Sequence, residues 1–352
     1  MEECFVRMKS FQLLGLIALA AATLDSQPTN GAVYWSAAAP DCSSLAGESP
    51  VAITNSSGTT IGYSCYVSGA FVWLAAGGGW RTSIRVAAPA SAPIGVDYTF
   101  YDTNGNNLEL DATTSGGEST TSGHGVNFAL SANQPAEVGL LGAPGDAPAY
   151  NSPSTGSVYA VFYCPDAATC GNVRPQLLYS ALPAIPWSPS VPIAWDTELW
   201  TQWSAVGIDD GATHRVSLAV YNEDLTATSF TVRIYNSTGS LVGTGTTPLI
   251  PPLQPLPNGA LGEGGTYGAL LSDVISGPLP AGLFKVLVDG GPRYSAVEVL
   301  QFDGLSATAL QVAYEGALSS ISTPTAVPDR RLNARRARVA STSKAAFGAL
   351  AR

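Results

Sequence analysis

Charged residues are scarce in this chain of 352 residues, because Asp, Glu, Lys and Arg together make up only 12% of it. This composition excludes the highly charged type of disordered chain. Helix signals are nearly absent as well, and residues 268–277 (GALLSDVISG) form the one segment typical of a short helix. Glycine and proline, in contrast, number 37 and 25. The composition therefore predicts an all-β chain with many tight turns between apolar strands.

Sequence motifs of catalytic sites are also missing. The chain contains no G-x-S-x-G, no H-E-x-x-H and no P-loop. Its two histidines, His124 and His214, stand in no known triad motif. A carboxylate pair for glycoside hydrolysis depends on separation in space rather than in sequence, and it stays the enzymatic alternative. We predict that the protein is not an enzyme and has no catalytic residues.

The N-terminus predicts the compartment. Arg7 and Lys9 precede an apolar run of 14 residues, 11–24, in which Ala18, Ala20 and Ala22 offer cleavage positions. The run is too short for a standard membrane-spanning helix, which needs about 20 residues. We therefore interpret residues 1–24 as a secretory signal peptide; a buried N-terminal helix is the alternative. The expected location of the mature, soluble protein is secreted, extracellular or at the cell surface.

Four cysteines remain once the signal peptide, with Cys4, is removed. An even number of cysteines in a secreted chain favours disulfides, and four cysteines allow three pairings. We predict Cys42–Cys65 and Cys164–Cys170, the second closing a short loop that begins with Pro-Asp. A metal site is the alternative, but the chain has no C-x-x-C pair and only two histidines.

An internal repeat gives the strongest structural signal. Residues 81–105 align without a gap on residues 215–239, at a constant offset of 134 positions. RTSIRV matches RVSLAV and VDYTFY matches FTVRIY, and each copy ends in Asx-x-x-Gly, at Gly105 and Gly239. An Asx residue followed three positions later by glycine is typical of a type I turn with a left-handed residue, so a further strand is expected to return after it.

Both copies alternate between apolar and polar residues, which predicts strands with one buried face. The positions expected to face inward are Thr82, Ile84, Val86, Val96, Tyr98 and Phe100 in the first copy and Val216, Leu218, Val220, Phe230, Val232 and Ile234 in the second. Later strands are predicted at 125–130, 136–142, 157–164 and 175–180, with counterparts at 241–247, 283–289, 294–302 and 308–315.

Two antiparallel sheets packed face to face bury such strands, which gives two related β-sandwich domains in tandem. We place them at residues 30–182 and 205–318. Over residues 80–318 this pattern resembles the immunoglobulin-like and fibronectin-type-III-like modules of secreted bacterial proteins, and residues 269–290 are similar to uncharacterised extracellular repeats of soil bacteria. The resemblance implies a surface or secreted role and no known activity.

A segment rich in proline and tryptophan, residues 183–204, separates the two domains. Its prolines favour an extended linker or a strap along a sheet edge. Two interpretations of its tryptophans stay open: stacking on sugar rings or anchoring a partner protein, or filling the seam between the domains. Trp200 and Trp203 are the better core candidates and Trp187 the better exposed one. As candidate ligand-binding residues we name Trp187, Trp195, Trp200 and Trp203.

Calcium is the one cofactor that the sequence suggests. The acidic pair Asp209-Asp210 near the domain junction offers two adjacent carboxylates to a hard cation. Residues 102–111 also carry oxygen ligands, but they lack the glycine and the carboxylate of an EF-hand, and we interpret them as a turn. Otherwise no cofactor is expected.

Charge divides the chain. Residues 25–328 contain seven Lys or Arg and 23 Asp or Glu, whereas the basic tail, counted from Asp329, contains seven Lys or Arg and one Asp. The acidic body argues against nucleic-acid binding, and residues 319–352 are expected to be a solvated, disordered tail. We predict a non-catalytic surface-interaction or adhesion protein whose partner is a cell-surface protein or an extracellular polysaccharide. A carbohydrate-binding protein and a polysaccharide-active hydrolase are the alternatives.

Overall fold

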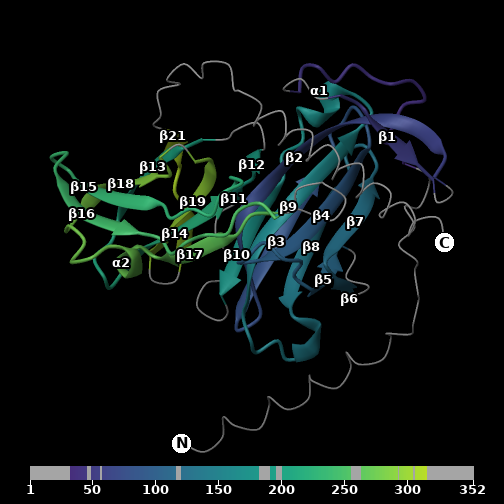
Figure 1. Ribbon diagram of the computed structural model, residues 1–352. Coiled ribbons are helices and arrows are strands. Elements are labelled where there is room, and N and C mark those ends of the chain that lie inside the picture. Colours follow the sequence, from purple (N-terminus) through teal and green to yellow (C-terminus); the bar gives the residue numbers. More distant parts are fainter. Residues whose placement is uncertain are drawn as a thin grey trace, which may run out of the picture.

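The computed structural model describes residues 32–314, except 46–48, 56–57, 116–119, 182–190, 196–199, 255–262, 292 and 304–305. The predicted signal peptide and the tail from residue 319 lie outside the described residues. In Figure 1 the elements of the described chain are almost all strands, as the composition predicts. All strand pairs are antiparallel within four sheets. We refer to residues 32–195 as the first half and to residues 200–314 as the second half.

The first half consists of two sheets. One has the order β1-β2-β9-β4-β7, with β12 also pairing with β2, and the other has the order β11-β10-β3-β8-β5-β6. The strands are β1 Val51–Thr54, β2 Thr60–Ala76, β3 Trp80–Ala87, β4 Ile94–Asp102, β5 Leu110–Thr114, β6 Thr120–Gly123, β7 Gly125–Leu130, β8 Pro135–Gly142, β9 Ser154–Cys164, β10 Gln176–Ala181, β11 Val191–Pro192 and β12 Ala194–Trp195. A 3₁₀ turn, Pro144–Asp146, and a helical turn, α1 (Ala167–Cys170), complete it.

The second half also consists of two sheets, with the orders β16-β15-β18-β13-β21 and β17-β14-β19-β20. Its elements are β13 Gln202–Ile208, β14 His214–Asn222, β15 Thr231–Asn236, β16 Leu241–Thr246, β17 Thr266–Leu270, α2 Leu271–Val274, β18 Leu283–Asp289, β19 Ser295–Asp303, β20 Ser306–Ala309 and β21 Ala313–Tyr314. The predicted short helix at 268–277 is therefore the end of a strand followed by one helical turn. No helix among the described residues has the length and hydropathy of a membrane span.

Two apolar cores form where the sheets face each other. The alternation in the repeat places its side chains as predicted, and all twelve inward positions are buried. Tyr98 and Phe100 contribute to the core of the first half, and Phe230 and Ile234 to that of the second. Because the period of a strand is two residues, the intervening positions point to the outer faces of the sheets.

Strand order shows that the repeat extends far beyond the 25 aligned residues. The path β2-β9-β4-β7 corresponds to β13-β18-β15-β16, and β10-β3-β8 corresponds to β19-β14-β17. Two short strands follow in each half. In the first half β11 pairs with β10 and β12 pairs with β2, and in the second half β20 pairs with β19 and β21 pairs with β13. Nine strands of each half thus have a counterpart in the other.

This correspondence corrects part of the predicted register. The counterpart of β7 is β16, as expected, but β8 corresponds to β17 rather than to residues 283–289. The later strands are displaced in the same way, since β9 matches β18 and β10 matches β19. The helix predicted at 268–277 overlaps the end of β17, and the strand missed there shifts every later counterpart by one.

The strand order departs from the immunoglobulin order at both ends. In an immunoglobulin constant domain the first strand pairs with the second and the last strand with the sixth. Here the first repeated strand, β2, pairs with the sixth, β9, and the seventh, β10, pairs with the second, β3. The fourth strand, β7, also pairs with the third, β4, rather than with the fifth. The likeness therefore extends to the sandwich and its central strands, while the edge strands are placed differently.

The repeated Asx-x-x-Gly turns are formed as predicted. The N–H groups of Gly105 and Gly239 donate to the carbonyl oxygens of Asp102 and Asn236 at 3.0 and 2.9 Å. Both glycines are left-handed, with φ of +80° and +79°. After Gly239 the chain returns as β16 beside β15, whereas after Gly105 it makes one bridge to Tyr101 and continues to β5 in the opposite sheet.

Two disulfides pair as predicted, Cys42–Cys65 and Cys164–Cys170, each with a Cα–Cα distance of 5.5 Å. Cys65 on β2 lies opposite Cys164 on β9, so the two bridges are neighbours at one end of the first sandwich. The first attaches the N-terminal segment to β2, and the second closes the turn of α1. The second half contains no cysteine and is held by its apolar core.

The two halves pack through an outer sheet face. Ala219 and Tyr221 of β14 and Ala296 of β19 form an apolar cluster with Ala70 and Val72 of β2. Further along β19, Leu300 belongs to the apolar cluster of the first half. The Thr266 hydroxyl donates to the carbonyl of Val72 at 2.7 Å, and the Thr266 N–H donates to the carbonyl of Thr103 at 3.0 Å. Figure 1 shows the two groups of sheets side by side, with β2 and β12 close to the second half.

We predict that the Cys42→Ser/Cys65→Ser double variant loses about 3 kcal/mol of unfolding free energy, because the bridge closes a loop with a sequence separation of 23. The Cys164→Ser/Cys170→Ser variant, with a separation of 6, should lose about 2 kcal/mol. Guanidinium unfolding of both variants measures this. A larger loss from the shorter loop would contradict the argument.

Candidate functional site

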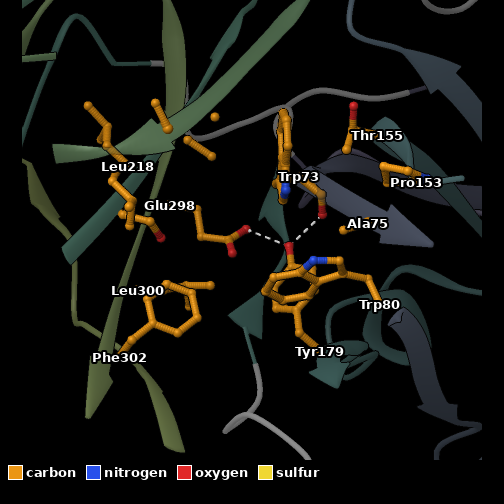
Figure 2. A pocket seen from close by; sticks show the side chains of 15 residues that line it. Trp73, Ala75, Trp80, Pro153, Thr155, Tyr179, Leu218, Glu298, Leu300 and Phe302 are labelled. Atoms are coloured by element: carbon orange, nitrogen blue, oxygen red, sulfur yellow. Dashed lines mark hydrogen bonds between the residues drawn. The ribbon is translucent and has the colours of Figure 1, made fainter. Parts of the chain in front are cut away.

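A pocket of about 260 Å³ lies at the seam between the two halves. The first half contributes side chains from β2, β3, β9 and β10, and the second half contributes residues of β14, β17 and β19. Figure 2 shows Trp73, Trp80, Tyr179 and Phe302 around the carboxyl group of Glu298. The pocket is therefore largely aromatic and aliphatic, with a single acid, and neither half forms it alone.

The β2–β3 hairpin supplies two of the walls, Trp73 and Trp80. Its turn, Gly77-Gly78-Gly79, has three consecutive left-handed residues with φ of +77°, +60° and +87°, a conformation that glycine adopts without steric cost. A Cβ atom at Gly77 would lie 2.3 Å from the carbonyl oxygen of Ser152. The glycines thus let the turn approach residues 150–153, which bring Pro153 to the pocket.

Small residues of the second half make room for the Trp73 ring. A Cβ atom at Gly268 on β17 would lie 3.0 Å from three atoms of the indole, so the ring rests directly on this backbone. Ala219, which is opposite Gly268 on β14, also lines the pocket. Larger side chains at these two positions would occupy the space that the indole fills.

Successive side chains of β19 point to opposite faces of the sheet, and this places Glu298 in the seam between the two halves. Val297 and Val299 face the core of the second half, so Glu298, Leu300 and Phe302 point to the outer face and into the pocket. The Glu298 residue is only 5% exposed. The Tyr179 hydroxyl lies 2.5 Å from the carbonyl oxygen of Trp73 and 3.3 Å from Oε2 of Glu298, so the closer acceptor is the carbonyl.

Burial controls the ionisation of this pair. Loss of hydration raises the pKa of Glu298 to about 8, and the hydrogen bond from Tyr179 only partly opposes that rise. Burial, together with the nearby Glu298, raises the pKa of Tyr179 well above its usual value. Within the described part of the chain, no Lys, Arg or His lines the pocket. At neutral pH Glu298 is therefore largely protonated and can donate a hydrogen bond.

A second cavity, of about 400 Å³, lies on the other side of Glu298. It is lined by β11, β12 and the residues between β20 and β21, together with Trp203. The segments that close the two sandwiches, β11–β12 and β20–β21, thus meet here as well.

The structure places three of the four predicted tryptophans. Trp195 lies on β12 at the edge of β2, and its ring is 6.0 Å from that of Phe162, edge to face. The Trp203 Nε1–H donates to the carbonyl of Ser295 at 3.0 Å, and its ring packs on the core of the second half. Trp200 forms a bridge with Ser295. Trp187 lies outside the described residues. The three side chains are half-buried.

Asp209 and Asp210 are engaged in holding the β13–β14 turn. Asp209 accepts from the N–H groups of Gly211 and Val216, and Oδ1 of Asp210 accepts from three backbone N–H groups, at residues 212, 213 and 214. Oδ2 of Asp210 lies 3.0 Å from Nδ1 of His214. No group of three or more His, Cys, Asp and Glu suited to a metal ion occurs among the described residues. The calcium hypothesis therefore gains no support from this arrangement.

The described lining of the pocket and the contacts of His214 can be compared with the groups that hydrolysis uses. Glycoside hydrolysis uses two carboxyl groups, whereas Glu298 is the one acid among the described lining residues. His214 has carboxylates on both ring nitrogens, with Asp303 at 3.7 Å from Nε2. Between described side chains, no hydrogen bond from a hydroxyl to this ring is formed.

No family model matches the chain, and no curated protein or solved structure is significantly similar to it. The site must therefore be interpreted from its own chemistry.

Sequence analysis concentrated on residues 183–204 and missed Trp73, Trp80 and Glu298. Two signals were present. Three consecutive glycines directly before Trp80 mark a turn with a close backbone approach, and Glu298 is an acid within the apolar strand sequence SAVEVL. An ionisable residue in a strand of this kind indicates a face that another element covers.

We predict that Glu298→Gln removes a pH dependence of stability. Between pH 4.5 and about 8 the folded chain keeps a proton on Glu298 that the unfolded chain releases, so the unfolding free energy should fall as the pH rises, by roughly 1.4 kcal/mol per unit. Urea unfolding at pH 5, 6.5 and 8 measures the difference between wild type and variant.

Glu137→Gln serves as the control. Burial raises the pKa of Glu137, but hydrogen bonds from Ser83 and Arg85 outweigh this and lower it overall, so the residue stays ionised over that range. The change of unfolding free energy with pH in this variant should match that of the wild type. A Glu298→Gln slope equal to that of the wild type would refute the assignment.

We also predict that Asp210→Asn lowers the pKa of His214. The hydrogen bond to Asp210 raises that pKa, and the charges of Asp210 and Asp303 add to the effect. Asparagine keeps the Oδ1 acceptor of the turn but removes the charge and, with it, the Oδ2 acceptor of the hydrogen bond to His214. Since the raised pKa favours the folded state at low pH, this contribution is lost as the pH rises past about 6.5 and through the pKa of the folded state. NMR titration of the two histidine rings measures it, with His124 as the internal reference. An unchanged His214 titration curve would contradict the prediction.

Proposed function

We propose that this chain is a secreted, non-catalytic surface-interaction protein of two β-sandwich modules, and that its ligand binds in the pocket around Glu298. The observation that carries the proposal is the convergence of Trp73, Trp80, Tyr179 and Phe302 on one carboxyl group. A concave, mainly apolar site with a few polar groups is the usual form of a small-ligand pocket. Trp73 and Trp80 are half-buried, so part of each indole is open to a ligand.

Several features support a role outside the cell. The chain has two disulfides and an acidic body, and its N-terminus is typical of a signal peptide. A cell-surface protein or an extracellular polysaccharide is the proposed partner.

Carbohydrate binding is the form of this function that the aromatic walls favour. An indole offers a large, rigid, amphipathic surface for stacking on a sugar ring. Trp73 and Trp80 replace the interdomain tryptophans as the proposed contacts, because both line the pocket around Glu298, whereas Trp195 and Trp203 do not. The single acid favours binding over hydrolysis at this site.

We expect titration with a panel of extracellular polysaccharides to change the tryptophan fluorescence saturably, without release of reducing sugar. Trp73→Phe and Trp80→Phe should each weaken binding at least fivefold by removing stacking surface. Trp195→Phe, a half-buried tryptophan away from the pocket, is the matched control and should bind as the wild type does.

Sugar release would contradict the non-catalytic assignment. A saturable change that survives both pocket variants would place the ligand elsewhere on the molecule. A panel with no response would exclude the polysaccharides tested and leave a protein partner as the form of the proposal to be examined.

A further inference from the structure

Among the residues that the structure describes, Glu298 forms no ion pair with a basic side chain. Among the ion pairs that described residues form, Arg85, His214, Arg233 and Arg293 pair with other acids. The pocket is lined by none of these bases, and Tyr179 is the one other titratable group among its described lining residues. A buried carboxylate without a cation is costly, because neither water nor a counter-ion compensates its charge.

The walls around this carboxyl suit a cation. The face of an aromatic ring attracts ammonium groups, most strongly for tryptophan, and cages of several rings are the usual way to bind alkylated ammonium ions. In Figure 2 the side chains of Trp73 and Trp80 lie on the same side of Glu298 as the Tyr179 hydroxyl, and Phe302 lies across from them. A ligand between these rings would have an acid on one side and aromatic surface on the others.

We infer that the pocket binds an organic ammonium ion, with Glu298 as its counter-ion and Trp73, Trp80 and Tyr179 as the aromatic surface around it. This inference rests on the proposed function and specifies the ligand. An anion would meet Glu298 without any basic residue to offset it. A neutral apolar ligand would offer the carboxyl group neither an opposite charge nor a hydrogen-bond partner. An ammonium ion can pair with the carboxylate of Glu298 and contact the faces of the aromatic rings at the same time.

Binding of such a cation is coupled to a proton. The empty site keeps Glu298 protonated at neutral pH, whereas the complex requires the carboxylate. The affinity for a quaternary ammonium, which does not itself titrate, should therefore rise as the pH rises to about 8 and level off above it. Below that pH the loss should approach tenfold for each unit.

Choline and 3,3-dimethylbutan-1-ol test the charge, because they have nearly the same shape and differ in the quaternary nitrogen. We expect choline to bind the full chain at least tenfold more tightly than the alcohol at pH 8, measured by tryptophan fluorescence and by calorimetry. Between pH 8 and pH 6 the choline affinity should fall, while that of the alcohol should not change. At pH 7 calorimetry in two buffers should detect proton release.

Glu298→Gln keeps the shape of the side chain and should remove both the preference for choline and its pH dependence. Circular dichroism and the unfolding curve check that this variant is folded. Trp80→Leu gives an independent readout, because it keeps an apolar wall and removes the ring: choline affinity should fall at least fivefold and that of the alcohol should change less.

The source of the ammonium group is tested with oligomers of glucosamine and of N-acetylglucosamine. Preference for the amine form would support an amino-sugar polymer as the source, whereas binding of choline alone would support a quaternary ammonium compound. Equal affinity for choline and the alcohol would overturn the inference and leave the proposed binding function standing. If no ammonium probe binds but a polysaccharide does bind near Trp73, the inference is likewise overturned and the proposed binding function stands. If neither the ammonium probes nor the polysaccharide panel bind, both the inference and the polysaccharide form of the proposed function are overturned.

Discussion

Burial of β14 and β19, the central strands of the β17-β14-β19-β20 sheet, on both faces is the constraint on which the rest of the seam depends. One face packs on the core of the second half through Val216, Leu218 and Val299, and the other packs on β2 of the first half. A strand with two buried faces has no solvent side for a polar residue. Glu298 stands in such a strand, so its acid lies in the seam, and its pKa and its surroundings follow from that position.

The contact between the halves also explains why the pocket is open. A flat packing of two apolar faces would close over the acid, but Trp73 is placed against Gly268, and its neighbour Ala75 is small. The glycine turn then brings Trp80 and Pro153 beside the gap rather than into it. The glycines thus determine the shape of the pocket as much as the aromatic residues do.

Local alternation allowed much of the fold to be predicted. The inward positions of the repeat, both disulfides and both Asx-x-x-Gly turns follow from residues close together in the chain. The register of later strands failed at residues 266–270, where α2 directly follows a short strand and an apolar run suits either structure. The pocket could not be found in this way, because it joins Trp73 to Glu298 across more than 200 residues, and local pattern carries no information about which outer face meets which.

Comparison of the two copies shows why only one outer face binds a partner module. At equivalent positions, Arg85 of β3 is opposite Glu137 and Gln176, whereas Ala219 of β14 is opposite Gly268 and Glu298. Arg85 and Glu137 form an exposed ion pair that would have to be desolvated before another sheet could pack there. Packing against Ala219 and Gly268 requires no desolvation of charged side chains, and the small size of these two residues leaves room for the indole of Trp73.

The turns at equivalent positions, between β2 and β3 and between β13 and β14, also differ between the two copies. Gly77, 134 positions before Gly211, belongs to the all-glycine turn that ends at Trp80 and adjoins the seam, while the turn at Gly211 is held by Asp209 and Asp210 and ends at His214. One copy thus has a hairpin that lines the pocket, and the other has the outer face that accepts it. Because the hairpin and the accepting face lie in different copies, the pocket depends on both sandwiches and on the differences between them.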